Sequence, residues 1–262
     1  MQLQCFQIDA FTDKVFCGNP ACVVSLNKWL PDDIMLKIAR ENGVAETAFF
    51  IDNGQKIQLR WFTPDIEMDL CGHATLATAH CIITILGLKK NNVVFETKSG
   101  LLSVILDNQY YKMDLPAREA IKESLPSIIK DSLNILPKEV LKARDYLLVY
   151  DNENDVKNIK IDRPVFDRIN LNPGGVIVTA KGNDCDFVSR FFTPQATILE
   201  DPVTGSAHCS LIPYWAKKLN KTKLAAKQIS ERGGQILCEN LGERVVLRGQ
   251  AKTYSIGNIF ID

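Results

Sequence analysis

Alternating apolar and polar positions predict several β-strands in the first half of the chain. The pattern places them at residues 4–11, 45–52, 56–62, 93–95, 101–106 and 110–115. Asn53-Gly54 and Asp107-Asn108 each separate two of these runs by a short turn. Because such turns join antiparallel neighbours, the first half is expected to form a mainly antiparallel sheet.

Two other segments have helical spacing. Pro31-Asp32-Asp33 opens an amphipathic helix that is expected to stop near Gly43. A second helix is predicted from Gly72 to Leu88, and from His73 onward it carries small and apolar residues around its whole circumference. Since a helix that is apolar on every side is buried on every side, we expect the strands to curl around it.

The second half repeats this plan after a charged segment. Residues 119–142 have a helical charge pattern that marks a boundary after Pro116. Strands are predicted at residues 146–150, 175–180 and 186–192, a helix near Gly205, and strands at residues 235–237, 244–247 and 254–261. The sequence therefore predicts an α+β protein of two pseudo-symmetric halves, residues 1–116 and 117–262, with the final strand crossing back to the first.

A repeated motif leads to each buried helix. Arg60-Trp61-Phe62-Thr63-Pro64 precedes the turn at Gly72, and Arg190-Phe191-Phe192-Thr193-Pro194 precedes the turn at Gly205. The free N–H groups and the dipole at a helix start attract anions. Two such starts brought together would clamp a carboxylate or a developing oxyanion; the alternative is a duplicated fold in which the repeated feature serves stability alone.

The overall composition excludes several classes of function. Lys+Arg and Asp+Glu both number 31, so the net charge of zero gives no basic surface for nucleic acid. No apolar run is long enough to span a membrane, and the N-terminal residues lack a signal-peptide pattern. The eight cysteines include no Cys-x-x-Cys pair, which predicts reduced thiols and no structural metal. We expect a cytoplasmic protein.

Three ionisable residues are candidates for chemistry. Glu46 interrupts an apolar strand, where burial would favour its neutral form and bring proton exchange towards neutral pH; the alternative is a carboxylate at a solvent-exposed strand edge. Asp201, held extended by the following proline, is either a functional carboxylate or an ordinary residue at a helix entry. His73, in a first helical turn, can cap the helix, donate to a substrate or relay a proton. His80 and His208 are expected to be packed, hydrogen-bonded core residues.

Two features near the second helix bear on its packing. Pro213 lies inside the predicted helix and is expected to kink it, because proline removes one helical hydrogen bond. The basic run from Lys217 to Lys227 predicts a solvated helix face.

Five segments together resemble the PhzF family of phenazine-biosynthesis-like isomerases. They occur in the family's order over nearly the whole chain, at residues 16–20, 46–49, 60–64, 70–77 and 200–207, which read FCGNP, ETAF, RWFTP, LCGHATLA and EDPVTGSA. The resemblance implies the architecture of diaminopimelate epimerase: two similar halves, each an antiparallel β-barrel wrapped around a central helix, with the active site between them.

The resemblance also implies a reaction, namely proton transfer at carbon without a metal or other cofactor. In PhzF proper, a glutamate matching Glu46 moves a proton between ring carbons of trans-2,3-dihydro-3-hydroxyanthranilate, a small molecule. Residues matching His73 and Asp201 assist this glutamate. The implied substrate-binding residues are Gly72, Gly205, Ser206, which would contact the substrate carboxylate, and Asn19. A homodimer is implied as well.

Two other functions remain open at this stage. Related amino-acid epimerases use one thiol from each half; Cys71 matches the first, but Thr204 stands at the second position, and a hydroxyl is too weak an acid/base to replace it. Cys71 is then a small buried residue. The chain could instead be a non-catalytic protein that binds a ligand or a partner with the same fold. One acid/base supplies roughly 10²–10⁴-fold in rate, which suits a C–H bond activated by neighbouring unsaturation and so favours the isomerase.

Overall fold

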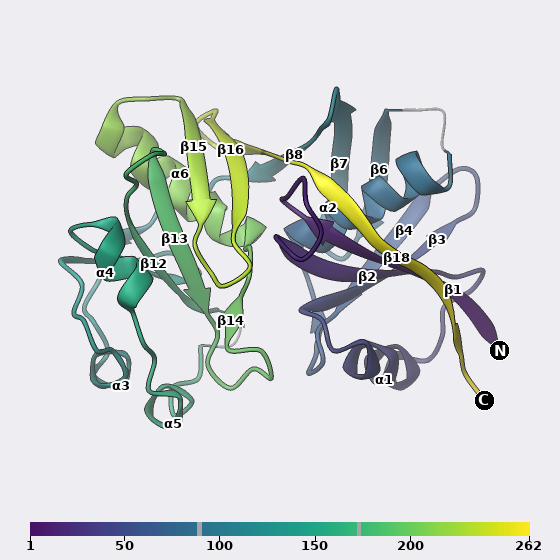
Figure 1. Ribbon diagram of the computed structural model, residues 1–262, viewed down its shortest axis with the longest axis horizontal. Coiled ribbons are helices and arrows are strands. Elements are labelled where there is room, and N and C mark those ends of the chain that lie inside the picture. Colours follow the sequence, from purple (N-terminus) through teal and green to yellow (C-terminus); the bar gives the residue numbers. More distant parts are fainter. Residues whose placement is uncertain (88–90, 172–173) are drawn as a thin grey trace. The chain divides into compact units, whose positions relative to one another are not determined.

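The computed structural model describes residues 1–87, 91–171 and 174–262, and it divides the chain into two compact units. The N-terminal unit comprises residues 1–114 and 248–262, and the C-terminal unit comprises residues 115–247. The last strand belongs to the N-terminal unit because it pairs with the first strand, so both chain ends lie in that unit (Figure 1).

The N-terminal unit is a mixed sheet with two main helices. In chain order its elements are β1 (Gln2–Ala10), β2 (Asn19–Ser25), α1 (Asp32–Asn42), β3 (Glu46–Asp52), β4 (Ile57–Phe62), β5 (Glu67–Met68), α2 (Gly72–His80), the π-helical turn η1 (Cys81–Ile85), β6 (Asn92–Thr97), β7 (Gly100–Asp107), β8 (Tyr110–Pro116), which runs across the boundary between the units, and β18 (Ala251–Phe260).

The C-terminal unit has one long helix and several short ones. Its elements are β9 (Ile121–Lys122), α3 (Ser127–Ser132), β10 (Glu139–Lys142), β11 (Tyr146–Val149), α4 (Glu153–Asn158), α5 (Arg163–Phe166), β12 (Val176–Lys181), β13 (Phe187–Phe192), β14 (Glu200–Asp201), α6 (Gly205–Leu219), β15 (Lys223–Gln228), β16 (Gly234–Asn240) and β17 (Arg244–Gly249), which ends just past the boundary. The chain is thus an α+β protein, as the sequence predicts.

Strand pairing follows the same scheme in both units. In the N-terminal unit β2–β3 and β4–β6 are parallel, while β3–β4, β4–β5 and β6–β7 are antiparallel. In the C-terminal unit β11–β12 and β13–β15 are parallel, while β12–β13, β13–β14 and β15–β16 are antiparallel. The sequence predicts the antiparallel pair β3–β4 from its short turn, but it misses β2, β5, β14 and β15 and therefore the pairs that they form. The parallel pairs, which bring together strands separated by a helix or a long loop, are not predicted either.

The N-terminal sheet is covered on both faces. Helix α1 packs on one face against an apolar cluster that includes Val24, Phe49 and Phe62. All nine residues of α2 are buried, as expected of a helix without a polar side. The expected helix from Gly72 to Leu88 is wrong in its last part, because α2 ends at His80, η1 ends at Ile85 and Gly87 has a positive φ. Thr84 and Leu86 are exposed there, and Leu88 itself lies outside the described residues.

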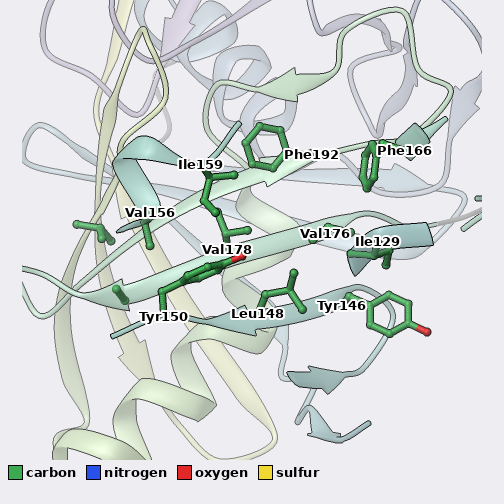
Figure 2. Packing of buried hydrophobic residues seen from close by; sticks show 12 residues of the cluster. Ile129, Tyr146, Leu148, Tyr150, Val156, Ile159, Phe166, Val176, Val178 and Phe192 are labelled. Atoms are coloured by element: carbon green, nitrogen blue, oxygen red, sulfur yellow. The ribbon is translucent and has the colours of Figure 1, made fainter. Parts of the chain in front are cut away.

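The C-terminal sheet carries its main cluster on the face covered by α3, α4 and α5. Figure 2 shows this cluster, in which Leu148, Tyr150 and Val178 from the sheet lie against Val156 and other helix residues. Helix α6 packs on the other face, where Trp215 Nε1 donates to Thr179 Oγ1 at 3.0 Å. Residues 178 and 179 point to opposite faces because side chains alternate along a strand.

Two expectations for this unit are wrong. Residues 119–142 contain only the six-residue helix α3 between two short strands, because Pro126 and Pro137 interrupt the helical pattern. The basic run from Lys217 to Lys227 is not one helix face, since α6 ends at Leu219 and the rest belongs largely to strand β15. In the described part of the chain, no helix is both long and apolar enough to cross a membrane.

Pro213 is accommodated within α6, which continues past it to Leu219. A proline has no N–H to give to the carbonyl four residues earlier, here that of Cys209. The backbone N–H of Arg118 donates to that carbonyl instead, at 2.8 Å. The hydrogen bond that proline removes is therefore replaced from outside the helix.

Gly18 cannot be replaced without moving the backbone. Its φ is +67°, and a Cβ atom would lie 2.2 Å from the carbonyl oxygen of Ala10. Gly54 is a matched control, since its φ is +82° but nothing lies within 4 Å of its Cβ position. We expect Gly54→Ala to lower the free energy of unfolding by about 1 kcal/mol from backbone strain, and Gly18→Ala by roughly 3 kcal/mol. Denaturant unfolding measures both, and equal losses would show that the clash at Gly18 relaxes freely.

Candidate active site

The candidate site in the N-terminal unit lies on the face of the sheet that α2 covers. Glu46 begins β3, and Ala21 of β2 is its register partner. Strand alternation puts Glu46 and Ala48 on the face opposite Phe49, which packs with α1. The Glu46 side chain therefore points towards α2 and away from the edge of the sheet, which decides between the two alternatives that the sequence left open.

His73, the second residue of α2, connects the other groups of the site. Its Nε2 lies 3.2 Å from Glu46 Oε2, and its Nδ1 lies 3.0 Å from Asn19 Nδ2. Because the Asn19 amide nitrogen donates, Nδ1 is an acceptor, and a neutral ring then carries its hydrogen on Nε2. Nε2 and Glu46 Oε2 are both buried, and at 3.2 Å the two atoms do not have the alignment of a hydrogen bond.

Burial keeps the His73 ring neutral. The side chain of His73 is 3% exposed, and the loss of solvation lowers its pKa to about 3. The Glu46 side chain keeps 13% of its surface exposed. At neutral pH the pair consists of an uncharged imidazole beside a carboxyl group whose Oε2 is buried.

Cys71 is the third member of this group. It precedes α2, is buried as expected, and its Sγ lies 3.6 Å from His73 Nδ1. Ligand atoms of Glu46, Cys71 and His73 all lie within 4.8 Å of one another. The thiol lies beside Nδ1 of the ring, whereas the carboxyl group lies beside Nε2.

An ion pair between Arg60 and Glu67 fixes the segment that leads into α2. The arginine Nε and Nη2 donate to Glu67 Oε1 and Oε2 at 2.7 and 2.9 Å, which ties β4 to the short strand before the helix. Burial alone would raise the pKa of Glu67, but the contacts with Arg60 and Lys98 outweigh it and keep the pKa below its usual value. Gly72 then opens α2 directly after this anchored segment.

The C-terminal unit has the same anchor before α6. Arg190 donates to Glu200 Oε1 and Oε2 at 2.7 and 2.8 Å. The next residue, Asp201, accepts a hydrogen bond from Thr204 Oγ1 at 2.5 Å. Gln228, which is 1% exposed, donates to the Asp201 carbonyl and accepts from the Thr204 N–H. Sequence reasoning missed Gln228 because this contact is formed between distant residues.

Gly205 and Ser206 are the first two residues of α6. The Ser206 hydroxyl accepts a hydrogen bond from Arg144 Nη2 at 3.0 Å. Arg144 was also missed, since nothing in its local sequence links it to a serine 62 positions away. The structure thus brings Glu46, His73, Asn19 and Gly72 together in one unit, and Asp201, Gly205 and Ser206 in the other.

The other two histidines are hydrogen-bonded core residues, as expected. His80 contacts the hydroxyl groups of Tyr111 and Thr253 at 2.9 and 2.8 Å. His208 Nδ1 donates to the Thr204 carbonyl at 2.8 Å. Both therefore act in packing.

Comparison with known proteins identifies the family. The model for PhzC-PhzF, described as phenazine biosynthesis-like protein, matches residues 8–257. The chain belongs to this family. An uncharacterized isomerase from Pseudomonas aeruginosa is 46% identical over 262 residues, with both chains fully covered. The PhzF resemblance predicted from the sequence is thereby confirmed.

Solved structures agree with this assignment. A PhzF family protein from Enterococcus faecalis has a TM-score of 0.93 and 43% identity, with 100% of both chains covered. A hydroxyproline epimerase from Agrobacterium vitis has a TM-score of 0.61 at 12% identity, covering 98% of this chain and 91% of its own. The second likeness shows a shared fold alone.

The three histidines predict how stability depends on pH. Burial lowers the pKa of His73 to about 3 and those of His80 and His208 to about 4, all below the unfolded value. The unfolded chain therefore binds more protons below about pH 6.5, so the histidine contribution is complete above that pH and is lost as the pH falls towards 4. We expect the free energy of unfolding to fall near pH 5 by roughly 4 kcal/mol per pH unit from these three groups.

Two measurements check this expectation. NMR titration of the folded protein should show no imidazole protonation between pH 8 and 5.5. Replacing one of them, as in His80→Gln, should reduce the pH slope of stability by about a third. A ring in the folded protein that titrates near pH 6.5 would contradict its burial in a neutral state.

Proposed function

We propose that this protein is a cofactor-independent isomerase that moves a proton between carbons of a small metabolite, with Glu46 as the acid/base. The observation that carries the proposal is the neutral His73 ring, whose Nε2 lies 3.2 Å from Oε2 of Glu46, a carboxylate on a side chain that is 13% exposed. In the proposed step the carboxylate takes a proton from one carbon, and electrons shift along the adjacent unsaturated bonds. The carboxylic acid then returns the proton to a second carbon, so that substrate and product contain the same atoms.

His73 and Asn19 would orient the acid/base. The Asn19 amide fixes the tautomer with the hydrogen on Nε2, and a small movement of the Glu46 side chain would let that hydrogen bond the carboxyl oxygen that is not exchanging the proton. The neutral ring leaves this proton transfer to the carboxyl group. Gly72, at the start of α2, would offer its backbone N–H to a developing negative charge.

The C-terminal unit would supply the remaining groups. Asp201 would assist the proton transfer, held in place by Thr204 and Gln228. Gly205 and Ser206 would bind the substrate carboxylate through the start of α6. We therefore propose a carboxylate-bearing unsaturated or cyclic substrate, whose C–H bond is already activated.

An amino-acid epimerase that uses Cys71 is the second candidate, because the thiol lies 3.6 Å from His73. Such a reaction needs a base on each face of the substrate. Thr204, at the equivalent position of the other helix, has its hydroxyl hydrogen bonded to Asp201. This bond disfavours Thr204 as the second base. A non-catalytic ligand-binding or partner-binding role would leave the Glu46–His73 pair without a use.

The proposal also covers the architecture, the oligomeric state and the location of the enzyme. By resemblance to its family, we propose that each unit closes as a β-barrel around its central helix, and that the protein is a cytoplasmic homodimer. Catalysis would involve no metal and no nucleic acid, in keeping with a net charge of zero.

Replacing Glu46 tests the proposed chemistry. Glu46→Gln keeps the shape of the side chain but removes its acid/base function, so proton exchange at carbon should fall by about 10²–10⁴-fold. The assay follows deuterium uptake and isomer formation in heavy water, with trans-2,3-dihydro-3-hydroxyanthranilate and separately with a set of amino acids. Glu41→Gln, an exposed change in α1, is the matched control and should keep full activity.

Cys71→Ala separates the two enzymatic candidates. In the isomerase this variant should lose less than about tenfold, because the thiol transfers no proton. Racemisation of an amino acid that disappears with Cys71 and survives Glu46→Gln would establish the epimerase instead. Exchange in no compound would favour the binding role.

A further inference from the structure

The hydroxyl group of Ser206 is held by a cation. Arg144 Nη2 lies 3.0 Å from Ser206 Oγ, and a guanidinium group can only donate. Ser206 Oγ is therefore the acceptor in this contact. In the described parts of the chain no other contact uses the hydroxyl hydrogen of Ser206, which is left to donate to a ligand.

Arg144 is itself fixed by a buried carboxylate. Its Nε lies 3.2 Å from both carboxyl oxygens of Asp145, and its Nη2 lies 2.9 Å from Oδ2. Asp145 is 1% exposed, and its Oδ1 also accepts from the backbone N–H of Gly175 at 2.9 Å. The hydroxyl of Ser206 is thus the outer end of a chain of hydrogen bonds that begins at the backbone N–H of Gly175, the residue before β12.

Such a chain changes what the hydroxyl can bind. Hydrogen bonds from charged donors are stronger than neutral ones, and successive bonds polarise one another. A hydroxyl that accepts from a guanidinium becomes a better donor, and a carboxylate is the ligand that gains most from it. The positive end of the α6 dipole and the guanidinium group of Arg144 also favour a negatively charged ligand.

Cys209, one turn into α6, lies near two positively charged side chains. Burial raises the pKa of the Cys209 thiol to about 11, while Arg118 and Arg144 act to lower it. Two guanidinium groups therefore act on the first turns of this helix, whereas Asp145 acts in the opposite sense.

We propose that Arg144 is a positioning residue that, through Ser206, makes this site select substrates with a carboxylate over their neutral amides. This inference rests on the proposed function in one respect, the contact between Ser206 and the substrate. It adds that the selectivity depends on Arg144 and on the Asp145 that holds it. A purely structural role, in which Arg144 only balances the buried charge of Asp145, predicts no such selectivity.

The test measures binding and needs no turnover. Anthranilate and anthranilamide serve as probes, since they differ only in the charged group, and calorimetry or ligand-observed NMR gives their affinities for the full chain. Native protein should bind anthranilate at least about tenfold more tightly than the amide. Ser206→Ala should weaken anthranilate binding by about tenfold to a hundredfold and change anthranilamide binding by no more than about threefold.

The variant of Arg144 must not leave a buried charge behind. Arg144→Met alone would leave the Asp145 carboxylate without its cation, so the decisive variant is Arg144→Met combined with Asp145→Asn, which keeps an acceptor for the Gly175 N–H. We expect the same selective loss of anthranilate binding as in Ser206→Ala. Adding Ser206→Ala to this variant should cost little more, because the residues act as one unit. Arg163→Met combined with Asp167→Asn, at an ion pair whose side chains are 44% and 30% exposed, removes one charge of each sign elsewhere in the same unit and is the matched control.

Several results would overturn the inference. The native protein could bind both probes with equal affinity or bind neither of them. The decisive variant could bind anthranilate within about threefold of the native affinity, or the losses caused by that variant and by Ser206→Ala could be fully additive. The isomerase proposal is decided separately by the heavy-water assay. Selective anthranilate binding without exchange in any compound would support the role of Arg144 and refute the isomerase; exchange without that selectivity would do the reverse.

Discussion

Two ion pairs of the same form hold the segments from which both helix starts are built. Arg60–Glu67 and Arg190–Glu200 each use Nε and Nη2 of the arginine against both oxygens of the glutamate, at 2.7–2.9 Å. Each guanidinium also lies over the phenylalanine ring two residues further along the chain. The pairs are partly buried, so removing one partner would leave a charge in poor solvent. The repeated Arg-aromatic-Phe-Thr-Pro motif therefore serves the backbone geometry before each helix, while the chemistry lies in the residues that follow.

At the start of α2, the imidazole ring of His73 is buried away from solvent. His73 lies in surroundings that oppose a charge on its ring, so its use at neutral pH is as a fixed donor and acceptor. Its two nitrogens face Asn19 on one side and Glu46 on the other. A side chain that is fixed in this way cannot readily move or take up a proton. Glu46 is the more exposed partner of this pair, with 13% of its side chain exposed against 3% for His73.

The sequence predicts elements whose pattern is local and fails where the pattern is ambiguous or the contact is distant. The all-apolar composition of α2 predicts its burial, and the alternation around Glu46 follows from the strand period. Residues 119–142 were misread because charges at helical spacing were weighed above Pro126 and Pro137. Strand β15 was missed although its burial alternates, since its lysines follow those of α6. The Arg144–Ser206 bond joins residues 62 positions apart, and no local pattern encodes it.

The two helix starts share a scaffold and differ in chemistry. Before and within the first turn, α2 carries Cys71 and His73, whereas α6 carries Thr204 and Ser206 at the equivalent positions. The first pair faces a carboxyl group through a neutral ring, and the second is tied to Asp201 and to a guanidinium group. A racemase works in both directions with equivalent bases on opposite faces, and this chain offers no equivalent bases at these positions. The proposed isomerase requires one acid/base and one anion-binding group, and so it does not require equivalent residues at the two helix starts.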